Sequence, residues 1–355
     1  MGILNILASL YLLIGSYSSA EAEGIRVYTF EPQTGEATYV TGASGISNPS
    51  FLCLSGDGRH VYAVGEDSGE TSTANYLKFS PRKGRLRLVN SRLTHGGAPC
   101  NIVLSPNGRM VLTANYFGGS ITAFPLNRWG RLLEGRPYRF AGHSVDPERQ
   151  TRPYLHAVYF TPDGSQMWCD DLGTDQVHAF PVGKDGMPLL DAQHQTDHFI
   201  KAGLGPRHLC FSCERPLAYL LGELSGEVCT LDYSNPTRIR VIQTLRADSL
   251  GAGGSADIHL SPDGRFVYTS HRLQGDGISI LRVRADGTLT KVGYQPTAAH
   301  PRNFAISPDG RYLLVACRDA DVVEVYRRNL TTGELSDTHE RIHMPKPVCL
   351  QFLER

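Results

Sequence analysis

The sequence predicts an all-β protein: a seven-bladed β-propeller with four antiparallel strands per blade, closed by N- and C-terminal segments that share one blade. One observation is a cassette of two apolar strands around a turn, which occurs six times at a spacing of about 50 residues. Its leading Ser or Thr stands at positions 55, 105, 161, 212, 261 and 307. A second observation is that the two ends of the chain together supply the strands of one more unit.

The cassette is predicted to form a β-hairpin. Clear copies are "IHLSPDGRFVYTSHR" (258–272) and "FAISPDGRYLLVACR" (304–318). Pro presets φ early in the turn, Asp accepts a local backbone hydrogen bond, and Gly takes a position with positive φ. A third strand with an aromatic residue follows, as in "SITAFPL", and then a Gly-containing turn and a fourth strand, as in "TTGELSDTHERI". Four short strands at this period are typical of a propeller blade.

The chain ends are predicted to complete the seventh blade. "KPVCLQFL" (346–353) matches the first strand of a unit, and "YLLIGSY" (11–17) matches the second. Sharing a blade removes an exposed sheet edge. We therefore expect one propeller domain over residues 1–355, with the shared blade formed by about 1–46 and 346–355. A signal peptide is the alternative for the apolar start, but no Lys or Arg precedes the apolar stretch.

Composition excludes some functional classes. The chain has 35 basic and 35 acidic residues, so it lacks the basic excess typical of proteins that bind nucleic acid or membrane surfaces. The eight cysteines include no Cys-x-x-Cys pair, and most lie in apolar strands, which favours reduced thiols. The thirteen histidines show no ligand spacing. We expect no metal, no cofactor, no nucleic-acid or membrane partner, and a cytoplasmic monomer or weak homodimer.

The register of the repeat concentrates polar residues at one end of the hairpins. Positions five residues before and eleven after the leading Ser or Thr face each other across the open end of each hairpin. Because the first two strands of a blade line the central channel, these positions should form a ring at one mouth, suited to a polar small molecule. The ring and its neighbours contain His156, Arg207, Arg302, Glu66, Tyr116, Glu223, Arg272, Arg318, Asn115 and His208.

The alternative for the mouth residues is a purely structural role, and a polar insertion is expected beside them. Any one of these residues could be an ordinary strand-end charge, but four Arg, a His and two Glu on two register positions of an apolar repeat favour a site. The polar insertion "AGHSVDPERQTRPYLHA" (141–157) should lie at the same mouth as a wall or lid.

With these motifs in place, the chain resembles the lactonase family of seven-bladed propellers, which includes 6-phosphogluconolactonases and fungal muconate-lactonising enzymes. The most specific motifs are "LHAVYF", "GPRHL", "GELSGEV", "TSHR" and "HPRNF", in that order, and the resemblance as a whole runs from "GSYSSAEAEGIRVYTFEPQTGE" (15–36) to "TTGEL" (331–335). The resemblance implies His156, Arg207, Glu223 and Arg272 as catalytic residues. The sequence departs from the family at Asn101 and Tyr154, where relatives usually carry His, and these departures could alter the shape of the substrate site.

The resemblance implies hydrolysis of a small anionic lactone, 6-phospho-D-glucono-1,5-lactone, in the pentose phosphate pathway by a carboxylic ester hydrolase. His156 is then the expected general base, because its ordinary pKa is near neutral. Glu223 could orient His156, or could itself be the base if an apolar funnel raised its pKa. Arg207 and Arg272 are expected to stabilise the oxyanion.

Substrate binding is expected of Arg302 and Arg318, which would hold the phosphate, and of Glu66, Tyr116, Asn115 and His208 around them. The alternatives are another propeller lactonase, a muconate-type cycloisomerase, or a non-catalytic propeller that binds a ligand through its mouth.

Overall fold

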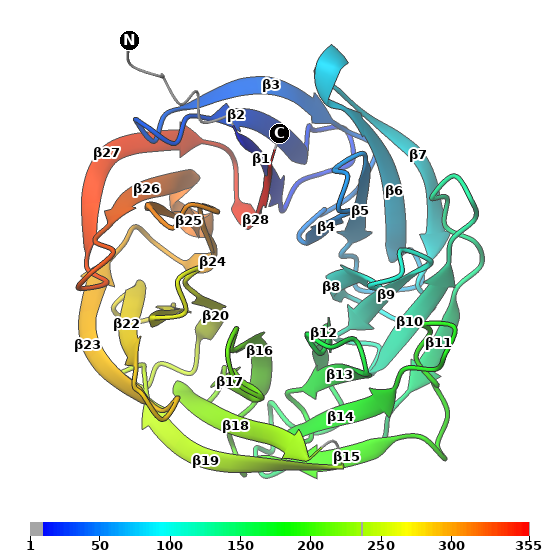
Figure 1. The fold of residues 1–355 in the computed structure, drawn as a ribbon. Helices are drawn as coiled ribbons and strands as arrows, with labels where there is room; N and C mark the ends of the chain where they lie inside the picture. The colour runs from blue at the N-terminus through cyan, green and yellow to red at the C-terminus, as the bar shows by residue number, and fades with distance from the viewer. Residues whose placement is uncertain (1–9, 236, 355) are drawn as a thin grey trace.

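The computed structural model describes residues 10–235 and 237–354 and confirms the seven-bladed propeller. Seven four-stranded antiparallel sheets are arranged in a ring, with the first strand of each sheet nearest the centre (Figure 1). These first strands are β4 (Leu52–Leu54), β8 (Pro99–Leu104), β12 (Leu155–Phe160), β16 (Pro206–Phe211), β20 (Ser255–Leu260), β24 (Pro301–Ile306) and β28 (Pro347–Leu353).

The second strands complete the channel hairpins. They are β5 (His60–Gly65), β9 (Met110–Asn115), β13 (Gln166–Asp171), β17 (Leu217–Gly222), β21 (Phe266–His271), β25 (Tyr312–Cys317) and β1 (Leu10–Ser16). The third strands are β6 (Thr73–Ser80), β10 (Ser120–Pro125), β14 (Gln176–Pro181), β18 (Glu227–Asn235), β22 (Gly277–Val283), β26 (Val322–Arg328) and β2 (Ile25–Phe30).

The fourth strands form the outer wall of the ring in Figure 1. They are β7 (Arg85–Leu93), β11 (Arg136–Arg139), β15 (Thr196–Phe199), β19 (Arg238–Arg246), β23 (Leu289–Pro296), β27 (Leu335–His343) and β3 (Ala37–Ala43). Two short 3-10 helices, η1 (Pro81–Lys83) and η2 (Arg318–Ala320), occur in the described part of the chain. No helix there is long and apolar enough to cross a bilayer.

The two ends of the chain close the ring as the repeat predicts. Strand β28 pairs antiparallel with β1, and the sheet continues through β2 to β3. Tyr11 pairs with Leu353 and Ile14 with Leu350, so the last strand lies innermost. The shared blade is thereby confirmed for residues 10–43 and 347–353, whereas the apolar residues 1–9 lie outside the described range.

The cassette turns that carry Asp or Asn followed by Gly have the predicted chemistry. In the β20–β21 hairpin, the Ser261 hydroxyl donates to Asp263 Oδ1 at 2.5 Å, and the Arg265 backbone N–H donates to the same carboxylate at 3.1 Å. Gly264 takes φ +69°, a conformation that favours glycine. These local bonds fix the hairpin and place its open end at the other face of the ring.

Large apolar side chains fill the spaces between neighbouring blades. Phe266 and Tyr268 of β21, fully buried, share one cluster with Leu313 and Val315 of the next blade. Burial of each such side chain stabilises the fold by about 1.5–3 kcal/mol. The buried tyrosines also bond across the interface, as the Tyr268 hydroxyl donates to the Gly333 carbonyl in the following blade at 2.7 Å. The blades are therefore held rigidly around the channel.

Candidate active site

The first strands carry β-bulges where they approach the mouth of the channel. Strand pairing skips His156 in β12, Arg207 in β16 and Arg302 in β24. A bulge releases a residue from the regular alternation of side chains and turns it to a new direction. The three residues that register placed in the ring are thus turned toward the channel.

A small cavity at the centre of the ring brings several predicted residues together. It is lined by Ser50, Phe51, Cys100, His156, Arg207, His208, Arg302, Asn303 and Val348. His156, Arg207 and His208 are each no more than 5% exposed. Charged and imidazole groups thus converge in a largely dehydrated space, where electrostatic interactions are stronger than in water.

Glu223 follows the end of β17 and anchors three arginines. Its carboxylate accepts from Arg207 Nε at 2.8 Å, from Arg149 Nη2 at 2.7 Å and from Arg272 Nη2 at 3.4 Å. Burial alone would raise the pKa of Glu223, but the charges of Arg272, Arg207 and Arg149 outweigh burial and lower it to about 2.

This geometry corrects two expectations for Glu223. Its pKa is lowered, not raised, so it is a permanent carboxylate at neutral pH and the condition for its use as the general base, a raised pKa, is not met. Both of its oxygens are bound by guanidinium groups, and it does not hydrogen-bond to His156. Glu223 instead fixes the positions of Arg207 and Arg272.

Arg272 links Glu223 to the rim of the mouth. Its Nε donates to the Gly254 carbonyl at 2.8 Å, and its Nη1 lies 3.3 Å from His300 Nε2. Burial and the neighbouring charge of Arg207 lower the pKa of Arg272 to about 9, which still leaves it charged at neutral pH.

Arg318 was expected to bind substrate, but it lies farther out. Its guanidinium donates twice to Asp319, at 2.7 and 2.9 Å, within the exposed helix η2. The structure therefore separates Arg318 from the central cavity.

Two imidazoles contact each other in the cavity. The rings of His156 and His208 are 5.0 Å apart between centroids, in an edge-to-face arrangement. Burial, together with the charge of Arg207, holds the pKa of His156 well below its ordinary value and lowers that of His208 to about 4. Both rings are therefore neutral at physiological pH and able to accept a proton.

Arg302 and Ser50 line the cavity, and Tyr17 and Glu66 contact them from outside its lining. The Tyr17 hydroxyl donates to Glu66 at 3.0 Å, and the Ser50 hydroxyl also donates to Glu66. The Arg302 guanidinium lies over the Tyr17 ring, 5.4 Å from its centroid. Arg302 forms no hydrogen bond or ion pair with any residue that the structure describes, so its donors are available to an anion.

Tyr116 and Asn115 are adjacent in sequence but face different surroundings. The Tyr116 ring packs against His156 and Tyr154, with centroids 5.6 and 4.8 Å away. Asn115 is fully buried in its own blade, where its amide donates to Ser120 at 3.1 Å and Thr122 at 2.9 Å. Asn115 was expected to bind substrate, but the structure places it outside the cavity lining, because strand alternation turns it into its own blade.

Sequence reasoning missed three residues of this site: Arg149, Tyr17 and Asp257. Arg149 belongs to the polar insertion, whose predicted place at the mouth is confirmed by the ion pair with Glu223. Tyr17 follows directly on the second strand of the closing blade, at a position that the register comparison did not include. Asp257 precedes the apolar run of β20 and accepts a hydrogen bond from His208 Nδ1, at 2.7 Å.

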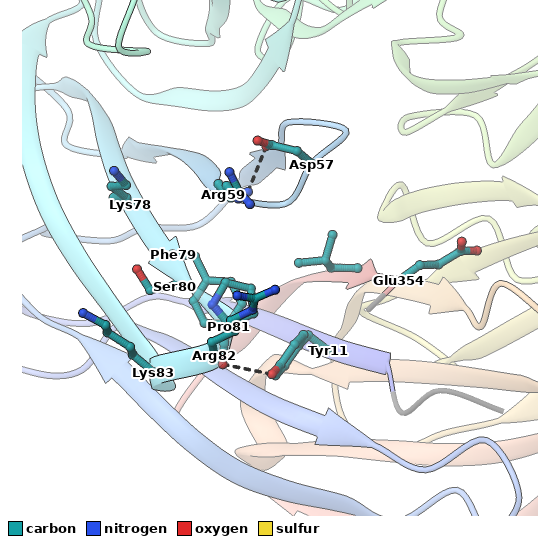
Figure 2. A pocket seen from close by; sticks show the side chains of 11 residues that line it. Tyr11, Asp57, Arg59, Lys78, Phe79, Ser80, Pro81, Arg82, Lys83 and Glu354 are labelled. Carbon is teal, nitrogen blue, oxygen red and sulfur yellow. Dashed lines mark hydrogen bonds between the residues drawn. The ribbon is translucent and has the colours of Figure 1, made fainter. Parts of the chain in front are cut away.

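A larger cavity of about 610 Å³ lies near the turn end of the closing blade and its neighbour (Figure 2). Tyr11, Phe79 and Pro81 form part of its wall, and the Tyr11 hydroxyl donates to the Pro81 carbonyl at 3.2 Å. The cations around it are exposed: Arg59, Lys78, Arg82 and Lys83. It lacks the buried, converging charges of the mouth.

Comparison with known proteins agrees with the seven-bladed fold. Residues 11–352 match the family model described as lactonase, 7-bladed beta-propeller. A 6-phosphogluconolactonase of Formosa agariphila is 31% identical over 96% of this chain and 99% of its own length. A 6-phosphogluconolactonase of Bacillus subtilis is 29% identical over 96% and 98%.

Solved structures give the same result. A Bacteroides fragilis protein assigned as a 6-phosphogluconolactonase is 42% identical, with a TM-score of 0.92 over 99% of both chains. The periplasmic gluconolactonase of Pseudomonas aeruginosa is 31% identical, with a TM-score of 0.89 over 98% of this chain and 99% of its own. The chain belongs to the lactonase family of seven-bladed β-propellers.

Proposed function

We propose that this protein hydrolyses a sugar lactone, with 6-phospho-D-glucono-1,5-lactone as substrate and 6-phosphogluconate as product. The observation that carries the proposal is the arrangement around Glu223. One buried carboxylate holds Arg207 and Arg272 beside the neutral imidazoles of His156 and His208. Such a site offers fixed positive charge and a proton acceptor together, as ester hydrolysis requires.

The reaction follows from these groups. A water molecule gives its proton to the imidazole pair of His156 and His208 while its oxygen bonds to the lactone carbonyl carbon. Arg207 and Arg272 stabilise the negative charge that develops on the carbonyl oxygen. The tetrahedral intermediate then breaks its bond to the ring oxygen, which takes the proton back from the imidazolium. The product is the open hydroxy acid, which ionises to the carboxylate.

A phosphorylated substrate is favoured by Arg302. Its guanidinium lines the same cavity and carries no hydrogen bond or ion pair to a described residue, whereas Arg207 and Arg272 are bound to Glu223. A phosphate group can accept two parallel hydrogen bonds from one guanidinium. Arg302 is therefore the residue that we assign to the phosphate.

The second candidate is the unphosphorylated glucono-1,5-lactone, favoured by the similarity to the Pseudomonas aeruginosa gluconolactonase. Initial rates on both freshly prepared lactones, corrected for spontaneous ring opening, decide between them. We expect a higher kcat/KM for the phosphorylated lactone. A preference for the unphosphorylated lactone would remove the role of Arg302, and no acceleration of either would leave the cycloisomerase and the non-catalytic propeller as the remaining functions.

The cellular role follows from the substrate. Hydrolysis of 6-phosphogluconolactone would place the enzyme in the pentose phosphate pathway and in the cytoplasm. Fractionation of cells that express the full chain tests this location, and recovery of the protein outside the cytoplasm would contradict it.

A further inference from the structure

The two imidazoles of the cavity differ in how they are held. His208 Nδ1 lies 2.7 Å from Asp257 Oδ1, whereas neither ring nitrogen of His156 is hydrogen-bonded to a described residue. A carboxylate can only accept a hydrogen bond. The neutral His208 ring must therefore carry its proton on Nδ1, which leaves Nε2 as an unprotonated acceptor.

The free nitrogen of His208 belongs to a ring that lines the central cavity. Nε2 is buried and has no hydrogen-bond partner among the described residues, and the same holds for His156 Nδ1. Both rings line the central cavity, which has free space for about one water molecule. A water molecule held there could donate to His208 Nε2 and also contact His156.

Asp257 is itself fixed from several sides. It accepts from Asn303 Nδ2 at 2.5 Å, from the Ile258 backbone N–H at 3.0 Å and from His259 Nε2 at 2.9 Å. Burial would raise the pKa of Asp257, but the charge of His259 and the bond to His208 lower it. Asp257 is therefore an ionised carboxylate, and its position leaves the His208 ring little freedom to turn.

The residues at the position of Asp257 in other blades show which of its contacts require a carboxylate. Asn101 Oδ1 accepts from the Val158 N–H of the next blade at 3.1 Å, and Asn303 Oδ1 accepts from the Leu350 N–H at 2.7 Å. Asp257 Oδ2 accepts from the Phe304 N–H in the same way, at 3.3 Å. An amide is sufficient for this contact between blades, so the negative charge at position 257 serves another purpose.

We propose that His208 is the proton acceptor of the site and that Asp257 is the positioning residue that presents His208 Nε2 to the attacking water. The proposal rests on the lactone hydrolysis proposed above. In the hydrolytic step, the water proton moves to His208 Nε2, the imidazolium is stabilised by the Asp257 carboxylate, and the proton then passes to the ring oxygen of the lactone as the ester bond breaks. His156 holds the same water from its other side.

The first test is Asp257→Asn in the full chain. An amide can donate to His208 Nδ1, which moves the ring proton to Nε2 and removes the acceptor. We expect kcat to fall by at least about 100-fold with KM within about threefold of wild type. The variant should fold, because an amide already makes the same contact between blades at Asn101 and Asn303.

The matched control is Asp263→Asn in the same hairpin. Asp263 lies in the turn at the other end and forms an ion pair with Arg328 at 2.6 Å. Loss of this ion pair should lower the free energy of unfolding and leave kcat within about threefold of wild type. An equal loss of kcat in both variants would overturn the proposal.

The second test asks whether Asp257 acts through His208. In a His208→Gln background, Asp257→Asn should lower kcat by less than about threefold further, because the group that it positions is already absent. A full additional loss in the double variant would show a purely structural role and overturn the proposal.

The third test observes the tautomer directly, without activity. Nitrogen-15 NMR of the histidine-labelled wild-type protein, assigned by difference with His208→Gln, should show His208 protonated on Nδ1. Protonation on Nε2 would overturn the proposal even if the lactone is hydrolysed. A wild-type protein that hydrolyses no lactone would overturn the proposed function separately, and the assignment of His208 as acceptor would fall with it.

Discussion

Arg149 and Glu223 form an ion pair between two neighbouring blades, with Arg149 Nη2 2.7 Å from Glu223 Oε1 although 74 residues separate them. Arg149 belongs to the insertion before β12, and Glu223 ends the hairpin of β16 and β17. The contact ties the insertion to the open end of the β16–β17 hairpin. It also gives Glu223 a third cation besides Arg207 and Arg272.

Arg149→Ala should weaken substrate binding more than folding. Because the Arg149 side chain is 43% exposed, its loss should cost less than about 1 kcal/mol of unfolding free energy. We expect KM to rise by roughly 10-fold, since the insertion loses its anchor at the mouth. Arg152→Ala is the control, because Arg152 lies over the Tyr154 ring in the same insertion. If the steady-state kinetics of Arg149→Ala were unchanged, the insertion at 141–157 would not act as a lid on the site.

Glu223→Gln should reduce both activity and stability. The neutral amide leaves the buried Arg207 and Arg272 without a counter-charge, which should cost roughly 3–5 kcal/mol in urea unfolding. Because the same arginines lose their fixed positions, kcat should fall at least about 100-fold. Circular dichroism checks that the variant is folded. Wild-type kcat in a folded Glu223→Gln protein would contradict the role of the carboxylate.

The pKa of Glu223 also predicts how wild-type stability depends on pH. Its folded-state pKa of about 2 is below the ordinary 4.5, so the unfolded chain binds the proton first as pH falls. The contribution of Glu223 is fully present above about pH 4.5 and is lost as pH falls toward 2. Urea unfolding of wild type and Glu223→Gln between pH 6 and 3 should show this component in wild type alone. If the free energies of unfolding of the two proteins changed in parallel with pH, the low pKa of Glu223 would be contradicted.

Arg302→Ala should separate the two candidate substrates. Loss of a charge-assisted contact to phosphate is expected to raise KM for 6-phosphogluconolactone by roughly 10- to 100-fold. KM for the unphosphorylated lactone should change by less than about threefold. Arg318→Ala is the matched control, because Arg318 is bound to Asp319 outside the cavity. An equal effect of Arg302→Ala on both lactones would contradict phosphate recognition.

The imidazoles predict the acid limb of the pH–rate profile. An acceptor must be unprotonated, and burial lowers the pKa of His208 to about 4. The groups that face His208 are Asp257, Arg207, His259 and His156. After subtraction of spontaneous hydrolysis, kcat/KM should therefore stay level from pH 8 to below 6 and fall only toward pH 4. A midpoint at or above 6.5 would contradict burial of the acceptor.

Several features of this site were predictable from the repeat because they depend on register. Arg207 and Glu223 occupy facing positions of one hairpin, and their ion pair of 2.8 Å confirms that geometry. The position of Asn115 was not predicted correctly. Asn115 is next to Tyr116 in sequence, and successive residues of a regular strand face opposite sides of the sheet.

The other features of the site could not be predicted, because they depend on backbone geometry that the residue types do not indicate. The bulge at Arg207 changes the local alternation of β16. The contact of Arg149 depends on the path of a long insertion, and the contact between His208 and Asp257 crosses from one blade to the next. Repeats in a sequence predict positions within a blade more readily than contacts between blades.

The most direct test of the central claim is the initial rate of ring opening of freshly prepared 6-phosphogluconolactone by wild type and by His156→Ala, corrected for the spontaneous reaction. We predict rapid hydrolysis by wild type and a loss of at least about 100-fold in a folded His156→Ala protein, because the water that His208 deprotonates loses the imidazole that holds it from its other side. A wild-type rate equal to the spontaneous rate, or full activity without the His156 imidazole, would contradict the claim that this cavity hydrolyses the lactone.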